Sequence, residues 1–139
     1  MKTASWVLLT LLGVAALALS LVSAWVAYHG EFQIGPASLS GLEAAVPGVG
    51  LALRGARGTA AAFAFAYAVL LLSVVLGPYR RGDRWAFWAI LASACALALV
   101  TGLRVPLLGI RPGAGTGTVF LVVAIVALLL DVRRLRAVR

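Results

Sequence analysis

Acidic residues, histidine and cysteine are nearly missing from this chain: its 139 residues include four Asp or Glu, one His and one Cys. The single Cys95 excludes an intramolecular disulfide and a CxxC redox pair. One His and one Cys cannot form a metal site or a Cys–His nucleophile within a single chain. The four carboxylates are scattered and form no acid–base pair at a catalytic spacing. We therefore expect no catalytic residue, no cofactor and no metal.

Charge is also missing from four long apolar segments. They comprise residues 6–28, 59–77, 85–103 and 116–132. These segments contain no Lys, Arg, Glu or His and a single Asp, Asp131, near the end of the last one. A helix needs about 20 apolar residues to cross the roughly 30 Å core of a bilayer, and only a helix satisfies its own backbone polar groups in lipid. The sequence therefore predicts an all-α integral membrane protein, a four-helix bundle that forms a single domain over residues 1–139.

The first apolar segment has an alternative interpretation as a cleavable signal peptide. Lys2, the apolar run and the small residues of 22–24 all resemble such a peptide. The run of 23 residues is, however, much longer than the roughly 7–15 apolar residues of a signal peptide. It also ends in Trp25 and Tyr28, which are residue types typical of a membrane–water interface. We interpret it as the first transmembrane helix.

The positions of the basic residues predict how the chain is threaded. Eight of the twelve lie on the side of the N-terminus: Lys2, Arg80, Arg81, Arg84, Arg133, Arg134, Arg136 and Arg139. The other four are Arg54, Arg57, Arg104 and Arg111. Because Lys and Arg concentrate on the cytoplasmic side, we expect a multi-pass protein of the bacterial inner membrane with both termini in the cytoplasm. These residues sit at segment ends and not on one polar face, so we expect no nucleic-acid partner despite the net charge of +8.

The loops differ in length. The second loop, residues 78–84, is predicted to be a tight hairpin, whereas the first, extracytoplasmic loop covers about thirty residues, 29–58. Within it, Ser40-Gly41-Leu42-Glu43 fits a capping box, which predicts a short helix from Gly41 to the break at Pro47. The apolar residues of this loop indicate that it lies on the membrane surface or folds over the mouth of the bundle.

A candidate binding site lies on the same side as the first loop. Arg54 and Arg57 precede the second apolar segment, and Arg104 follows the third. If these helices are neighbours, three guanidinium groups converge on one mouth and suit a phosphate, sulfonate or carboxylate group. The alternative is that the arginines anchor helix ends and pair with Glu31 or Glu43.

Two further residues have structural and functional interpretations. Tyr67 lies at mid-membrane depth, where its hydroxyl needs a partner, either Ser93 or a ligand. His29 either ends the first helix at the interface or serves as a haem ligand or an intersubunit metal ligand. No Lys, Arg, Asp, Glu or His lies at mid-depth, which disfavours ion-coupled transport.

Several short motifs carry a family resemblance. They are Leu53-Arg54-Gly55-Ala56-Arg57-Gly58, Pro78-Tyr79-Arg80-Arg81 and the Arg104 that follows the third segment. Over roughly residues 35–130 the chain resembles the DoxX-like small four-helix membrane proteins of bacteria. The resemblance implies a four-helix bundle and at most an accessory role beside membrane oxidoreductases, and it supplies no catalytic residue.

Three functions remain open from the sequence. The first is a non-catalytic accessory or assembly subunit of a larger membrane complex, with membrane lipids and either another membrane protein or further copies of the chain as partners. The second is a binding or carrier protein for an amphipathic anion, lipid or quinone at Arg54, Arg57 and Arg104, with Tyr67 below them. The third is a membrane enzyme that uses a partner's cofactor with a contribution from His29 or Tyr67. We favour the first.

Overall fold

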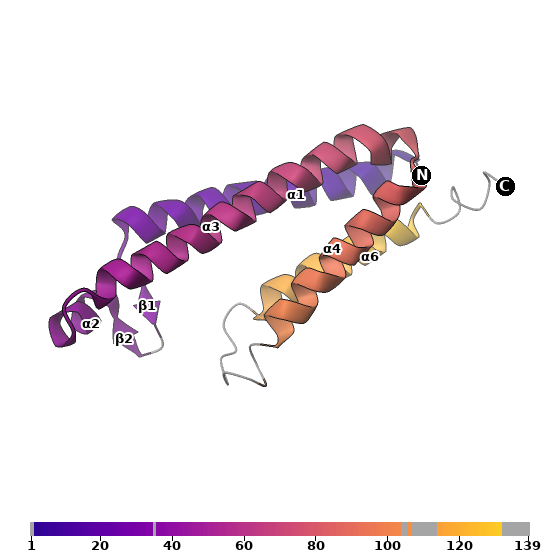
Figure 1. Cartoon of the computed structure of the whole chain (residues 1–139). Helices are drawn as coiled ribbons and strands as arrows, with labels where there is room; N and C mark the ends of the chain where they lie inside the picture. The colour runs from indigo at the N-terminus through magenta and orange to yellow at the C-terminus, as the bar shows by residue number, and fades with distance from the viewer. Residues whose placement is uncertain (1, 35, 104–105, 107–113, 132–139) are drawn as a thin grey trace. The chain divides into compact units, whose positions relative to one another are not determined.

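The computed structural model of the chain describes residues 2–34, 36–103, 106 and 114–131. Its elements are α1 (Lys2–His29), β1 (Gln33–Ile34), β2 (Ala37–Ser38), α2 (Leu39–Ala45), α3 (Val49–Val74), the π-helical segment η1 (Val75–Tyr79), α4 (Arg84–Gly102) and α6 (Ala114–Leu129) (Figure 1). Three stretches are long and apolar enough to cross a membrane: Ala4–His29, Val49–Tyr79 and Arg84–Gly102. The predicted all-α fold is confirmed, and these three stretches could span a membrane. The four-helix bundle and its topology stay predictions. The fourth predicted span corresponds to α6, a shorter helix of 16 residues.

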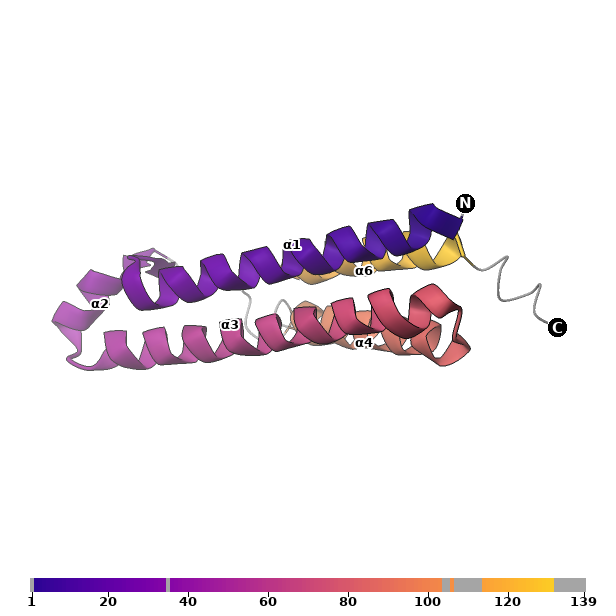
Figure 2. The same ribbon diagram turned by 90° about the horizontal axis from the view of Figure 1, so that it is seen from above.

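The chain divides into two compact units, which we describe separately. Unit 1 comprises residues 1–13 and 70–139, and unit 2 comprises residues 14–69. Each of the helices α1 and α3 therefore contributes to both units. Within either unit, α1 and α3 run antiparallel and alongside each other (Figure 2).

In unit 1, α4 packs along α6 through small residues at helical spacing. The buried residues of α4 are Ala86, Ile90 and Ala94. Those of α6 are Gly117, Phe120, Ala124, Ala127 and Leu128. Small residues let helix backbones approach closely, which drives helix association in lipid. The helices lie close together at Gly117, where an added Cβ would lie 3.0 Å from the Cβ of Thr101 and closer still to its hydroxyl oxygen.

Two buried hydroxyl groups, those of Ser5 and Tyr79, connect three segments of unit 1. The Ser5 hydroxyl of α1 donates to the carbonyl oxygen of Ala127 at 2.7 Å. It lies 2.6 Å from the Tyr79 hydroxyl, and because its only proton is already used, Tyr79 must be the donor in that second bond. The Ala127 carbonyl is one of the last four of α6, which have no partner within their own helix. Ser5 therefore caps α6 and holds Tyr79 at the same time.

The polypeptide stays helical beyond the predicted end of the second apolar segment. It was expected to leave the helix at residue 78, but η1 continues through Pro78 to Tyr79, and Arg80 and Arg81 are helical too. Proline lacks an N–H group, and the wider π-helical turn accommodates the lost hydrogen bond. The turn proper is Gly82–Asp83, where Gly82 has a φ of 98° and its N–H bonds to the carbonyls of Pro78 and Tyr79. The predicted hairpin is present, but the loop is shorter than predicted.

In unit 2, α3 begins ten residues before the predicted residue 59, so the predicted loop of about thirty residues shortens to residues 30–48. The cause is Glu43, whose carboxylate accepts hydrogen bonds from the N–H groups of Gly48, at 3.1 Å, and Gly50. This carboxylate satisfies N–H groups at the start of α3 and interacts favourably with the helix dipole. The prediction that Arg54 and Arg57 precede the helix is therefore wrong, since both lie on α3.

The short helix of the loop is confirmed, but its predicted start is wrong. Helix α2 begins at Leu39, and Ser38 caps it by accepting a bond from the Gly41 N–H at 3.1 Å. The expected capping box from Ser40 to Glu43 does not form, because Glu43 serves α3. Before α2, the antiparallel β1–β2 ribbon places Gln33 opposite Ser38.

Replacing Ser5 by alanine should destabilise the protein by about 1–2 kcal/mol, because the Ala127 carbonyl and the Tyr79 hydroxyl each lose a buried partner. Unfolding of the purified protein in detergent would measure this loss. Thr10→Ala is the matched control, since the Thr10 hydroxyl bonds only within its own helix, to the Trp6 carbonyl at 2.7 Å. Equal losses in the two variants would contradict the capping role of Ser5.

Gly117→Ala should also destabilise the protein, by about 1–3 kcal/mol, because the new methyl group would overlap the Thr101 side chain. Gly55→Ala is the matched control, because nothing lies within 4 Å of an added Cβ there. Since alanine favours a helix more than glycine, the control should gain about 0.5–1 kcal/mol. Thermal unfolding of both variants in the same detergent tests the pair, and a stable Gly117→Ala would rule out close packing of α4 on α6.

Candidate functional site

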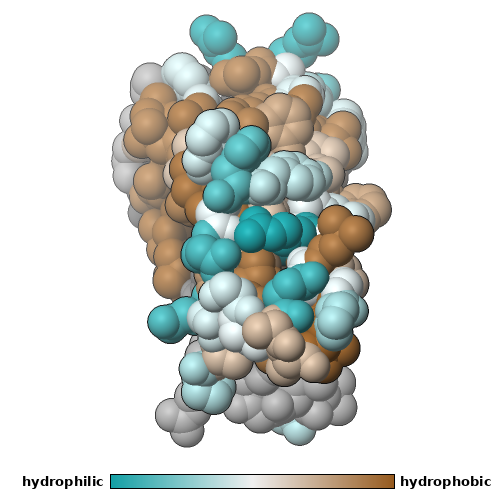
Figure 3. Space-filling view, turned by 90° about the vertical axis from the view of Figure 1, so that its left-hand side faces the viewer, coloured by the Kyte–Doolittle hydropathy of each residue, from teal (hydrophilic) through white to brown (hydrophobic). Residues whose placement is uncertain are grey.

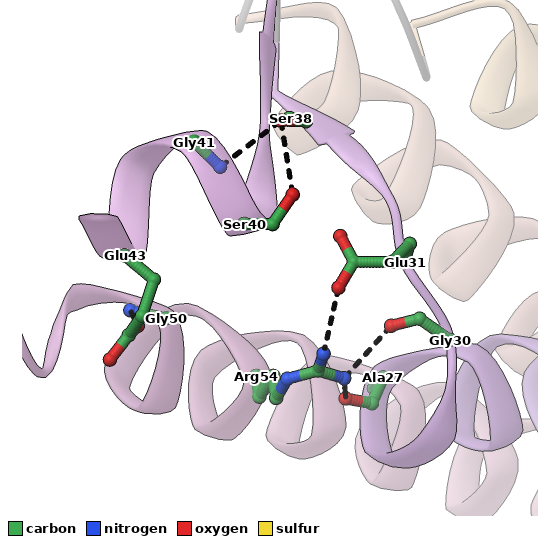
Figure 4. A network of polar contacts seen from close by, with 9 residues as sticks. All are labelled: Ala27, Gly30, Glu31, Ser38, Ser40, Gly41, Glu43, Gly50 and Arg54. Carbon is green, nitrogen blue, oxygen red and sulfur yellow. Dashed lines mark hydrogen bonds and ion pairs between the residues drawn. The ribbon is translucent and has the colours of Figure 1, made fainter. Parts of the chain in front are cut away.

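The candidate site lies in unit 2, where Arg54 joins α3 to the end of α1 (Figure 4). The Nη1 atom of Arg54 donates to the carbonyl oxygens of Ala27, at 3.2 Å, and Gly30, at 2.8 Å. Its Nη2 atom lies 3.7 Å from a carboxylate oxygen of Glu31. Ala27 is in the last turn of α1, so its carbonyl has no partner within the helix. Arg54 therefore caps α1 with a cation, the charge that a helix C-terminus favours.

The Arg54 guanidinium is already partly engaged by the chain itself. Its side chain is 28% exposed, its Nη1 atom makes two hydrogen bonds, and its Nη2 atom forms an ion pair with Glu31. The ion pair to the mostly exposed Glu31 contributes little by itself, because water screens it. The position of the guanidinium is fixed mainly by the two carbonyl groups. The predicted pairing of an arginine with Glu31 is thus present, and Arg54 anchors a helix end.

Arg57 makes a different contact. Its guanidinium carbon lies 4.5 Å above the centre of the Phe32 ring, an attractive cation–π arrangement. Among the residues that the structure describes, no carboxylate pairs with Arg57. Phe32 belongs to the segment between α1 and β1, so Arg57 also holds the loop against α3.

The other predicted site residues are only partly placed. Arg104 lies outside the described residues, so the convergence of three arginines stays a prediction. Tyr67 is a half-buried residue of α3. The Ser93 hydroxyl donates to the Ile90 carbonyl of its own helix at 3.0 Å. The hydrogen bond between Tyr67 and Ser93 also stays a prediction.

His29 is the last residue of α1, as predicted for an interfacial residue. Its ring stacks on that of Trp25, with ring centres 4.4 Å apart and planes at 21°. In the described part of the chain, no three His, Cys, Asp or Glu residues come together as metal ligands would.

The surface at this end of unit 2 mixes polar and apolar residues. Figure 3 views the end where α2 and the ribbon lie and shows hydrophilic side chains next to one another among apolar ones. Two large apolar residues are well exposed here: Val46 at 54% and Leu51 at 77%. We call residues 30–58 the head. Its charged side chains contact the chain itself, whereas these two apolar side chains face outward.

Sequence reasoning missed the roles of two residues that organise the molecule: Glu43, which caps α3, and Ser5, which caps α6. For Glu43, the signal was an acid shortly before Pro47-Gly48-Val49-Gly50, a turn whose glycine amides can approach a carboxylate. Gly48 has a φ of 87°, which glycine adopts readily. For Ser5, the signal was weaker: a small hydroxyl residue near the start of an apolar helix.

Replacing Arg54 by lysine should loosen the head, because an ammonium group cannot contact two carbonyls and Glu31 with the fixed geometry of a guanidinium. We expect hydrogen exchange of the amides in residues 30–48 to rise by about tenfold, measured by mass spectrometry on the protein in lipid nanodiscs. Arg57→Lys is the matched control, since lysine can still lie over Phe32. Unchanged exchange in Arg54→Lys, or an equal rise in both variants, would show that Arg54 does not anchor the head.

Comparison of the chain with protein-family models, with curated proteins and with solved structures gives no match. The resemblance to DoxX-like proteins therefore stays a prediction. The chain's own geometry consists of a head whose charged side chains contact the chain itself, carried by helices without a charged residue in their apolar middle.

Proposed function

We propose that this protein is a non-catalytic accessory or assembly subunit of a larger complex in the bacterial cytoplasmic membrane. Both termini lie in the cytoplasm, and the head lies on the opposite side. The absence of mid-membrane charge disfavours ion-coupled transport, which normally needs an ionisable group there. The use of Arg54, Glu31 and Glu43 in internal contacts supports it further.

Helix length supports a head that extends beyond the lipid. The 28 residues of α1 correspond to about 42 Å, and the 31 residues of Val49–Tyr79 to about 46 Å. The hydrocarbon core is only about 30 Å thick, and the 19 residues of α4 match it at about 28 Å. Tilt absorbs part of the difference. We infer that the first turns of α3 project past the lipid tails together with α2 and the ribbon.

The observation that carries the proposal is the apolar surface on this head. Leu51, in the first turn of α3, is 77% exposed, and Val46 is 54% exposed. Arg54 and Arg57, later on α3, contact α1 and Phe32 and leave these two residues exposed. Exposed apolar side chains of this kind suit a protein contact, because their removal from water is favourable. We propose that a partner subunit covers Leu51 and Val46. The resemblance to DoxX-like proteins would make that partner a membrane oxidoreductase.

A second candidate is a binding or carrier protein for an amphipathic anion, a lipid or a quinone. Arg57 favours it, because its cation lies on an aromatic ring and pairs with no carboxylate in the part of the chain that is described. A guanidinium beside Phe32 suits a ligand with an anionic head and an apolar body.

Native mass spectrometry of the protein, gently extracted from its own membrane, tests the proposal. We expect a second protein in fixed stoichiometry, and Leu51→Gln should reduce its co-purification at least tenfold, because the contact loses apolar area. Leu51→Met keeps that area and serves as the matched control.

Two other outcomes are informative. A retained small molecule without a protein partner, lost in Arg57→Gln, would replace the proposal with the second candidate. A protein that carries neither a partner nor a ligand would contradict both.

A further inference from the structure

We infer that the hairpin between η1 and α4 is a binding site for the head group of an anionic phospholipid. Three arginines, Arg80, Arg81 and Arg84, lie within five residues there, and Trp85 and Trp88 follow directly. All five belong to unit 1. The inference is independent of the proposed function, since it concerns a lipid and not a protein partner.

The backbone that presents the arginines is fixed on both sides. Before them, the buried Tyr79 is held by its hydrogen bond to Ser5. Between them, Gly82 adopts its positive φ, and the N–H groups of Gly82 and Asp83 bond back to the carbonyl of Pro78, each at 3.1 Å. A ligand therefore meets a preorganised turn and loses less free energy in ordering it.

The turn has a positive charge balance. Three arginines and one acid, Asp83, give a local charge of 3 − 1 = +2. Arg80 lies over the Trp6 ring at 5.1 Å, and Arg80 and Arg84 make further interactions within the protein. Arg81 is exposed and contacts no other charged group among the described residues. Its guanidinium fork suits a phosphodiester, and Arg81 is therefore the residue on which the inference chiefly depends.

The start of α4 adds a second attraction for an anion. Asp83 occupies the N-cap position, yet its side chain makes no capping hydrogen bond. Its carbonyl accepts a hydrogen bond from the Ala86 N–H at 3.2 Å. The first amides of α4, those of Arg84 and Trp85, lie at the positive end of the helix dipole, where an anion is favoured.

An apolar surface next to these charges distinguishes a lipid from a free anion. Trp85 and Trp88 stand three residues apart on one face of α4 and are 58% and 64% exposed. The ring of Phe87 meets Trp88 edge to face at 5.5 Å between ring centres and supports it. Further along the same face, Ala92 and Leu99 are exposed as well. Tryptophan prefers the membrane interface, and an acyl chain can follow this face of α4 below a head group at Arg81.

The test uses the full-length protein in nanodiscs with equal amounts of phosphatidylglycerol and phosphatidylcholine, followed by native mass spectrometry of the lipids it retains. Both leaflets then have the same composition, so the orientation of the protein does not matter. The wild type should be enriched in phosphatidylglycerol. Arg81→Gln should reduce that enrichment about fivefold, since one basic residue near an anionic surface contributes about 1 kcal/mol. Asp83→Asn should raise it, because it removes the carboxylate that lies between Arg81 and Arg84 in the turn, and asparagine also suits the N-cap position.

Trp88→Ala should lower phosphatidylglycerol retention, whereas Trp25→Ala, at an equally exposed tryptophan of α1, should not. Inorganic phosphate at millimolar concentration should leave the retained phosphatidylglycerol in place. The inference is overturned if Arg81→Gln keeps the wild-type enrichment or if Asp83→Asn lowers it. Full displacement by inorganic phosphate, with no effect of Trp88→Ala, would instead identify a site for a free anion.

Discussion

Side chains from other segments close three helix ends of this protein. Ser5 caps the end of α6 at Ala127, Arg54 caps the end of α1, and Glu43 caps the start of α3. A helix leaves its last carbonyl and first amide groups without partners, and in or near lipid no water replaces those partners cheaply. Because each cap comes from a different part of the chain, the caps fix how neighbouring segments of each unit meet. In this way a sequence with few polar residues still determines one arrangement within each unit.

Within the described residues, the side chains of Ser5, Glu43 and Arg54 bond to the backbone of other segments and so serve the structure itself. The surface has two features that suit binding. The head carries exposed apolar side chains, and the turn after Tyr79 carries arginines beside tryptophans. The first kind of surface suits a protein partner and the second suits a lipid head group. A small subunit with these two surfaces would be positioned by lipid and recruited by protein.

The sequence predicted those features that depend on composition over a long window. Helix α4 matches its predicted span within one residue at either end, because a continuous apolar run between charged flanks allows little else. The start of α3 was missed because Arg54, Gly55 and Arg57 resemble a loop in a hydropathy profile. Those residues are helical because nothing after Gly48 breaks the helix and because Glu43 caps it from an earlier segment.

Long-range polar contacts were the least predictable part of the candidate site. The pairing of Arg54 with Glu31 could be foreseen from opposite charges on the same side of the membrane. The bonds from Arg54 to the carbonyls of Ala27 and Gly30 could not, because backbone acceptors leave no trace in a sequence. The contact between Ser5 and Tyr79, which are 74 residues apart, depends on helix packing that only the fold reveals.

In the topology that we propose, the head and the turn at Gly82–Asp83 face opposite sides of the membrane. Single-cysteine labelling tests this directly, because the chain has only Cys95 to remove. In a Cys95→Ala background, Ser40→Cys on the head should react with a membrane-impermeant maleimide on intact cells. Asp83→Cys should react only after the membrane is permeabilised. Labelling of both positions from the same side of the membrane would contradict the proposed topology.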